Sequence, residues 1–281
     1  MGSLDFKSFE TSANMINITD VEGKIENNNL YLRERCHKAD KYYDFIVDKI
    51  LKSFNTWFFK REQPDSVEKL KDAVARAVKL EQPVSFVLYW GKGPRFERAH
   101  PDVLCLNYLN EFVNRITKIY KEGATITLIF TDTHARLNGF PSDATLQYFD
   151  EIADSAAQFN FRHCKLGELV NSLEKPHPTP ELPSDDMISK LSLSAAKWYR
   201  GTNTPHAAAR TYYAMNMIEK RAVGLAFPDA IFITFNGSEM RELFPDHLSI
   251  FYMYSLKRGT SVKPWFLPAS SGAEGDDPVN G

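Results

Sequence analysis

Two mostly apolar runs constrain the fold more than any other feature of the sequence. Residues 84–89 read VSFVLY and residues 124–130 read ATITLIF. Each has the length of a strand, and a continuous apolar run is typical of a strand buried on both faces. Apolar residues at helical spacing lie between them, over 102–121. Strand, helix and strand in this order predict a right-handed crossover between parallel strands.

The same reading, extended along the chain, predicts an alternation of helices and strands. Asp65 and Glu68 form a capping box that predicts the start of one helix. Residues 131–141 are interpreted as a polar loop. The other predicted helices cover 38–54, 142–158, 166–173, 185–199 and 206–225, and the other predicted strands cover 159–165, 230–235 and 248–256. The fold class is therefore α/β: a Rossmann-like, mostly parallel sheet with flanking helices and an elaborated C-terminal part with an antiparallel edge.

The ends of the chain differ in composition from its middle. Residues 1–30 are polar and weakly patterned, and residues 269–281 are small, acidic and rich in glycine. We expect a loosely ordered arm over 1–30, a single Rossmann-like domain over 31–268 and a disordered tail over 269–281.

Charge and targeting features narrow the classes of function. The chain has 34 basic and 36 acidic residues, so its formal net charge is −2. A general nucleic-acid binder usually has a marked basic excess, so no nucleic-acid partner is expected. Because no apolar run approaches 18–20 residues and the N-terminus lacks a signal-peptide pattern, we expect no membrane partner and a cytoplasmic location. The three cysteines, far apart and odd in number, are consistent with reduced thiols.

Familiar cofactor and catalytic motifs are missing. The sequence has no HExxH, no CxxC, no P-loop, no GxGxxG after a strand and no GxSxG. It therefore predicts no metal, no dinucleotide and no bound cofactor. His100 and His134 are interpreted as surface histidines rather than a metal pair.

Polar residues follow the two best strands, and ligands of open parallel sheets bind at the carboxyl ends of strands. The first group contains Lys92, Arg95 and Arg98, and the second contains Asp132, His134 and Arg136. Several cations with one carboxylate could hold a small anion and move protons. The alternative is an ordinary solvated loop.

The order of these segments resembles the pyoverdine/dityrosine biosynthesis family, the isocyanide (isonitrile) synthases. The resemblance covers most of 40–266, and no single motif is long. It includes the first strand, the Tyr-x-x-Gly-Ala segment before the second strand, and Thr-Asp-Thr where the family has Ser-Asp-Gly. The matching residues are 83–88, 119–126, 131–133, 217–222, 227–229 and 263–265.

This resemblance implies a Rossmann-like enzyme that needs no metal and joins an amino acid, usually tyrosine or tryptophan, to ribulose 5-phosphate. It implies that Lys92 binds an anion or polarises a carbonyl, that Asp132 acts as a base or amine anchor, and that Arg221 holds a carboxylate or phosphate. An oxygenase later in the same pathway is the implied partner. Together with the strand-end clusters, it gives Lys92, Asp132 and His134 as catalytic candidates, and Arg95, Arg98, Arg136, Arg221, Asn236 and Trp265 as substrate-binding candidates.

Three positions depart from the family pattern. Phe232 replaces an arginine, and Asn236 and Phe266 each replace a histidine. A phosphate-binding arginine and two histidines are thus absent from positions that should face the site. Two alternatives therefore remain open: a different reaction on an amino-acid-like substrate, and a binding subunit that kept the fold without catalysis.

Overall fold

The computed structural model describes residues 41–91, 98, 100–174 and 182–254. The arm predicted at 1–30 and the tail predicted at 269–281 lie outside these ranges. The chain divides into two units, and the one from Phe45 to Gly281 contains the whole sheet.

All five strands of the sheet are parallel, in the order β3-β2-β1-β4-β5. β1 and β2 pair along their full length, from Val84 opposite Ala124 to Trp90 opposite Phe130. The predicted α/β class is therefore confirmed. The strand bounds are β1 Val84–Trp90, β2 Ala124–Phe130, β3 Arg162–Lys165, β4 Ile231–Thr234 and β5 Ser249–Tyr252.

The predicted antiparallel edge is wrong, because β5 runs parallel to β4. A parallel connection needs a crossover of a dozen or more residues. The connection here contains only a 3-10 helix, η1, at Ser238–Leu243. Because this crossover contains no α-helix, its sequence resembles the connection of a hairpin, and the sequence therefore suggests an antiparallel strand.

The predicted helices are present with small shifts of their ends. Residues 41–54 are helical. An additional short helix, α4, begins directly after β2 within the segment expected to be a loop. The bounds are α2 Val67–Lys79, α3 His100–Thr117, α4 Asp132–Leu137, α5 Ser142–Ala157, α6 Leu166–Asn171, α7 Asp185–Trp198 and α8 Pro205–Ala226.

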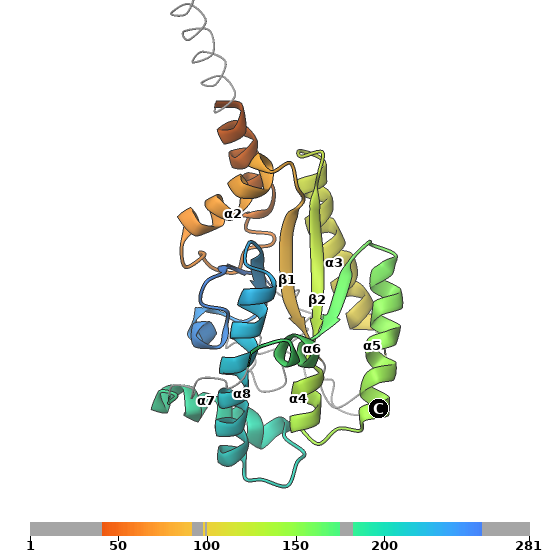
Figure 1. The fold of residues 1–281 in the computed structure, drawn as a ribbon, viewed down its shortest axis with the longest axis vertical. Coiled ribbons are helices and arrows are strands. Elements are labelled where there is room, and N and C mark those ends of the chain that lie inside the picture. Colours follow the sequence, from red (N-terminus) through yellow and green to blue (C-terminus); the bar gives the residue numbers. More distant parts are fainter. Residues whose placement is uncertain (1–40, 92–97, 99, 175–181, 255–281) are drawn as a thin grey trace, which may run out of the picture. The chain divides into compact units, whose positions relative to one another are not determined.

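Side chains of β1 alternate between two layers. Phe86 lies against Phe112 of α3, and Trp90 Nε1 donates to Tyr148 Oη of α5 at 2.9 Å. Val87 and Tyr89 belong instead to the apolar core that includes α7 and α8. In Figure 1, α3 and α5 lie side by side along β2 and β3, and α8 is on the other side of β1.

The start of α2 differs from the predicted capping box. Ser66 is the N-cap, and its Oγ accepts from Lys69 N at 3.1 Å. Asp65 instead pairs with Arg241 and accepts from Tyr252 Oη at 2.5 Å. The carboxylate expected to cap the helix therefore ties the segment before α2 to β5 and η1.

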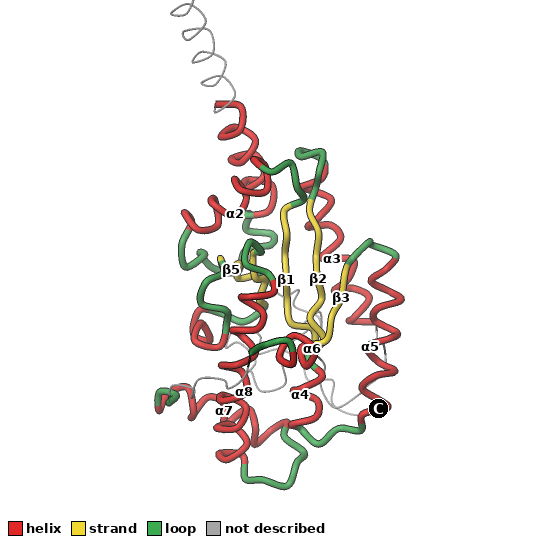
Figure 2. Tube along the Cα trace, in the orientation of Figure 1, coloured by secondary structure: helices red, strands yellow, loops and turns green. Residues whose placement is uncertain are grey.

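Short helices gather at the carboxyl ends of the strands. α4 follows β2, α6 follows β3, and both contact α8 (Figures 1 and 2). Thr131 N donates to Trp90 O at 3.0 Å, which joins the ends of β1 and β2. Side chains from β1, α4, α6 and α8 therefore meet at the edge where ligands of such sheets bind.

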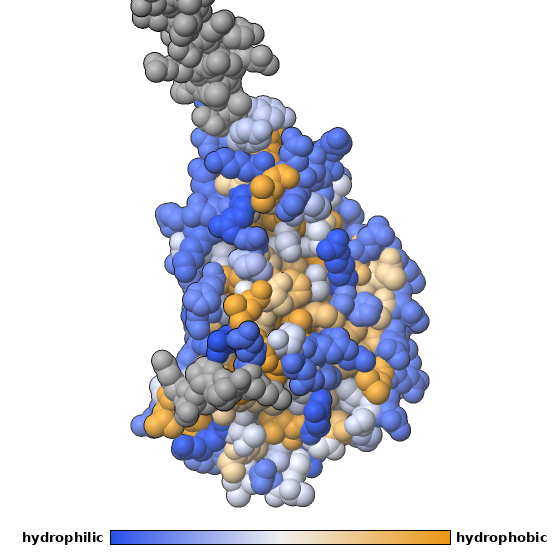
Figure 3. All heavy atoms as spheres, viewed as in Figure 1, coloured by the Kyte–Doolittle hydropathy of each residue, from blue (hydrophilic) through white to orange (hydrophobic). Residues whose placement is uncertain are grey.

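Among the described residues, no helix is both long enough and apolar enough to span a membrane. On the face shown in Figure 3, hydrophilic residues predominate and apolar residues gather in patches between them.

Candidate functional site

A buried histidine–carboxylate pair lies behind the carboxyl end of β2. His134 Nε2 of α4 is 2.8 Å from Glu219 Oε2 of α8, and both side chains are 0% exposed. Thr133 Oγ1 donates to the other oxygen, Glu219 Oε1. Asn138 Nδ2 donates to His134 O at 2.8 Å and closes the last turn of α4. A buried carboxylate needs such partners, because an unpaired one is costly to remove from water.

The prediction that His134 is a surface residue is wrong, whereas His100 is exposed as expected. Sequence reasoning also missed Glu219. The only local signal was its spacing of seven residues from Tyr212, which places both on one face of a helix. Its partner lies 85 residues earlier in the chain, so the pair becomes visible only in the fold.

Two buried tyrosines surround this pair. The Tyr89 ring lies 6.1 Å and the Tyr212 ring 5.1 Å from the His134 ring, centroid to centroid. Burial, and then the negative charge of Glu219, raise the pKa of both tyrosine hydroxyls well above the ordinary value. Tyr89 Oη has no hydrogen-bond partner among the described residues. Such a group at a strand end is typical of functional sites, where buried polar atoms are left for a ligand or water.

The raised pKa of Tyr89 predicts a loss of stability in alkali. Above pH about 10, the unfolded chain loses a proton that the folded chain keeps, so the free energy of unfolding falls as pH rises. Tyr89→Phe should reduce this slope by about 1.4 kcal/mol per pH unit. At pH 7 it should change stability by less than about 1 kcal/mol, because no hydrogen bond within the described chain is lost. Urea unfolding at pH 7, 10 and 11 measures both quantities, and an unchanged alkaline slope would contradict the assignment.

Asp132 begins α4 and joins it to α6. Its Oδ1 accepts from Gly167 N at 2.9 Å, and its Oδ2 is 3.5 Å from Arg136 Nη2. The Asp132 side chain is 18% exposed and that of Arg136 is 73% exposed. One carboxylate oxygen is thus held by the backbone, while the other has, among the described residues, only a long contact with a solvated arginine.

Gly167 allows this close approach, because a Cβ there would lie 2.6 Å from Asp132 Oδ2. Gly167→Ala should therefore displace the carboxylate and destabilise the protein by about 1–3 kcal/mol. Gly224→Ala is the matched control, since nothing lies within 4 Å of its Cβ position on α8. The control should stabilise by up to about 1 kcal/mol. Equal effects in thermal unfolding would show that Asp132 is not held as described.

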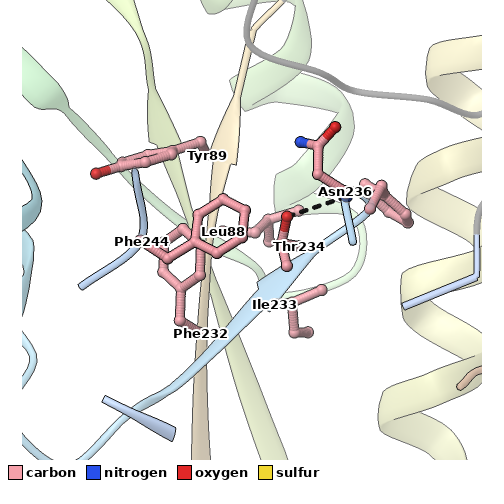
Figure 4. Close-up of a pocket in the computed structure, with 8 residues that line it drawn as sticks. Leu88, Tyr89, Phe232, Ile233, Thr234, Asn236 and Phe244 are labelled. Atoms are coloured by element: carbon pink, nitrogen blue, oxygen red, sulfur yellow. Dashed lines mark hydrogen bonds between the residues drawn. The ribbon is translucent and has the colours of Figure 1, made fainter. Parts of the chain in front are cut away.

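A small cavity of about 10 Å³ lies at the carboxyl ends of β1 and β4 (Figure 4). That is about the room for one water molecule. Asn236 and Thr234 form its polar part, and Asn236 N donates to Thr234 Oγ1 at 3.1 Å. Figure 4 shows the Tyr89 hydroxyl pointing away from Asn236. The lining residues are Leu88, Tyr89, Phe232, Ile233, Thr234, Phe235, Asn236 and Phe244.

Only some of the candidate residues come together. Asp132 and His134 are at the strand ends, and the buried Asn236 lines the cavity. Arg98 instead contacts α5, where its N donates to Glu151 Oε2 at 3.2 Å and its Nη1 to Ser155 Oγ at 3.0 Å. Lys92, Arg95, Trp265 and Phe266 lie outside the described residues.

Arg221 is turned away from the buried pair. It lies two residues after Glu219, which is roughly 200° around α8, and it is exposed. It lines a separate surface cleft with Ser172 and Glu174 at the end of α6. Within the described ranges, no three His, Cys, Asp or Glu side chains gather as a metal site would require.

Comparison with known proteins gives a likeness of fold. No protein-family model matches the sequence, and no curated protein matches it. Among solved structures, the chain is similar to the PvcA protein from Pseudomonas aeruginosa, with a TM-score of 0.58 and 14% sequence identity. The match covers 79% of this chain and 88% of that chain. The chain therefore has a PvcA-like α/β fold.

Proposed function

We propose that the chain is an isocyanide-synthase-like enzyme that converts the amino group of an amino acid of the tyrosine or tryptophan type. Its proposed co-substrate is ribulose 5-phosphate or a related small anion, and the proposal includes no metal or cofactor. An oxygenase acting on the product is the proposed partner in the same pathway.

The observation that carries this proposal is the position of Asp132 at the carboxyl end of β2. Gly167 N holds one of its carboxylate oxygens, the other is 3.5 Å from Arg136 Nη2, and the side chain as a whole is 18% exposed. In a parallel sheet this is where substrates bind, and the aromatic cavity lies at the ends of neighbouring strands. The fold likeness to PvcA and the ordered segments shared with the isocyanide synthases support the same reaction class.

In the proposed reaction, Asp132 Oδ2 accepts a proton from the substrate ammonium group. The amine nitrogen then uses its freed electron pair to attack the sugar carbonyl carbon, and loss of water leaves an imine. The carbon–carbon bonds of the sugar then break, and its other carbons leave as fragments until one carbon remains on the nitrogen as the isocyanide. Lys92, proposed from the sequence alone, polarises that carbonyl. General-base catalysis of this kind contributes about 10²–10⁴-fold to a rate.

His134, a catalytic candidate in the sequence analysis, has a different role in this proposal. Its side chain is wholly buried against Glu219, so in this proposal it is a positioning residue. The pair fixes α4 against α8, and α4 carries Asp132 on its first turn. A rigid element holds a catalytic group more accurately than a loop does.

A second candidate is supported by the character of the cavity. No charged side chain is among its described lining residues, and Phe232 and Asn236 stand where the family has an arginine and a histidine. That lining favours an amino-acid-like ligand without a phosphate, either for another reaction or for binding alone.

Incubation of the protein with tyrosine or tryptophan and ribulose 5-phosphate, followed by mass spectrometry, tests the first candidate. We expect an isocyanide product and loss of both substrates. No product over a panel of amino acids would contradict it. Ligand-induced thermal stabilisation that is lost in both Lys92→Ala and Asp132→Ala, without turnover, would then support the binding candidate.

A further inference from the structure

A surface cleft of about 350 Å³ lies between the start of α2 and the start of β5. α2 contacts β5, and the two elements are near one another in Figure 2. The cleft is at the amino end of β5, whereas the candidate site is at the carboxyl ends of β1 and β2. Its volume is in the range of small-molecule sites, about 300–1,000 Å³. The polar residues that line it are Asp65, Ser66, Lys69, Arg241 and Ser249.

Ser249 supplies a buried hydroxyl without a partner. The residue is 7% exposed, and its Oγ has no hydrogen-bond partner within the described part of the chain. Such groups are rare, because a buried polar atom without a hydrogen bond lowers stability. Ser249 shares a face of β5 with Phe251, which packs against Phe54, so its side chain points away from the core beneath α8. A ligand in the cleft can therefore give this hydroxyl the partner that it lacks.

The first turn of α2 supplies amide hydrogens to the same cleft. α2 is 13 residues long, and Ser66 is its N-cap, with Oγ accepting from Lys69 N at 3.1 Å. The N–H groups of Val67 and Glu68 have no partner within the helix, and the helix dipole makes this end positive. Helix N-termini of this kind bind anions. Glu68 is acidic, but it is not among the residues that line the cleft.

The charged side chains of the cleft leave an excess of one positive charge. Asp65 and Arg241 neutralise each other in an ion pair. Asp246 Oδ1 lies 3.9 Å from Arg241 Nη1, but Asp246 is itself paired with Lys220 at 3.0 Å. Lys69 is exposed and forms no ion pair with any residue that the structure describes. Its ammonium group can therefore bind an anion.

We propose that this cleft binds the phosphate group of a small molecule, with hydrogen bonds from Lys69 Nζ, Ser249 Oγ and the first amides of α2. These donors come from a side chain of α2, a side chain of β5 and a helix backbone. A phosphate has enough acceptor oxygens, in different directions, to meet all three. The inference goes beyond the proposed function and does not depend on it, because the cleft contains none of the residues proposed for that reaction.

The test uses inorganic phosphate as the probe. Isothermal titration calorimetry is carried out with the wild-type protein, with sodium chloride added to keep the ionic strength constant. We expect one phosphate per chain with a Kd of about 1 mM or tighter. Acetate should bind at least about 10-fold more weakly, because a carboxylate has too few oxygens for the three donors. Equal affinity for acetate would overturn the assignment to phosphate.

Variants at the cleft locate the binding site. Lys69→Met and Ser249→Ala should each weaken phosphate binding at least about 10-fold, because each removes one donor. Without phosphate, Ser249→Ala should be as stable as the wild type or more stable, because an unpaired buried hydroxyl is removed. Lys79→Met is the matched control, since Lys79 is also exposed on α2 but lies about 15 Å further along the helix. It should keep the wild-type affinity.

The outcomes separate this site from the proposed reaction. Asp132→Asn should bind inorganic phosphate as tightly as the wild type, whether or not isocyanide formation is observed. Undetectable phosphate binding, or unchanged affinity in either Lys69→Met or Ser249→Ala, would overturn the site. An equal loss of affinity in Lys79→Met would also overturn it, because the effect would then come from the net charge of the protein.

Discussion

His134→Leu should lower the free energy of unfolding by about 3–5 kcal/mol, because it leaves the Glu219 carboxylate buried without its main partner. Both side chains are fully buried, so water cannot replace the lost contact without opening the α4–α8 interface. Of the side-chain contacts of Glu219 with described residues, the hydrogen bond from Thr133 would remain. Urea unfolding with a linear extrapolation measures the change.

His100→Leu is the matched control, because His100 is exposed on the first turn of α3. It should change stability by no more than about 0.5 kcal/mol. The double variant His134→Leu, Glu219→Leu should recover much of the loss, since no buried charge is then left unpaired. A small effect of His134→Leu alone would contradict a buried pair between α4 and α8.

Asp132→Asn should reduce kcat/KM for isocyanide formation by about 10²–10⁴-fold, the usual contribution of a general base. Asparagine retains an oxygen that can accept from Gly167 N, so the link between α4 and α6 and the stability should be kept. The loss should therefore appear in the rate and not in the unfolding transition.

Asp150→Asn provides the control for this change, because Asp150 is exposed on α5, away from the strand ends. Its kcat/KM should equal that of the wild type. If Asp132→Asn kept full activity, Asp132 would serve only to join α4 to α6.

Local sequence pattern was sufficient for most of the architecture. The runs at 84–89 and 124–130 predict β1 and β2 because a strand buried on both faces needs continuous apolar residues. The helices between the strands follow from apolar spacing in the same way. The direction of the edge strand, in contrast, could not be predicted from local sequence pattern. β5 could not be oriented from sequence, because η1 gives no sign of the crossover that a parallel strand requires.

The buried pair of His134 and Glu219 could not be predicted from local sequence pattern. Glu219 and His134 each look like solvated residues in their own segments, since glutamate is almost never fully buried unless it is paired. Their burial depends on a contact across 85 residues. Asp132 was singled out because a simple rule, the strand-end position of ligand sites, applies to it. Asn236 was singled out only by the family resemblance, because it stands where the family has a histidine.

The isotopic origin of the product carbon tests the proposed function most directly. The protein is incubated with tyrosine or tryptophan and uniformly ¹³C-labelled ribulose 5-phosphate, and the product is analysed by high-resolution mass spectrometry. The account predicts an isocyanide one mass unit heavier than the unlabelled product, because one sugar carbon remains on the amino nitrogen. An isocyanide without the label, or an unchanged amino acid, would contradict it.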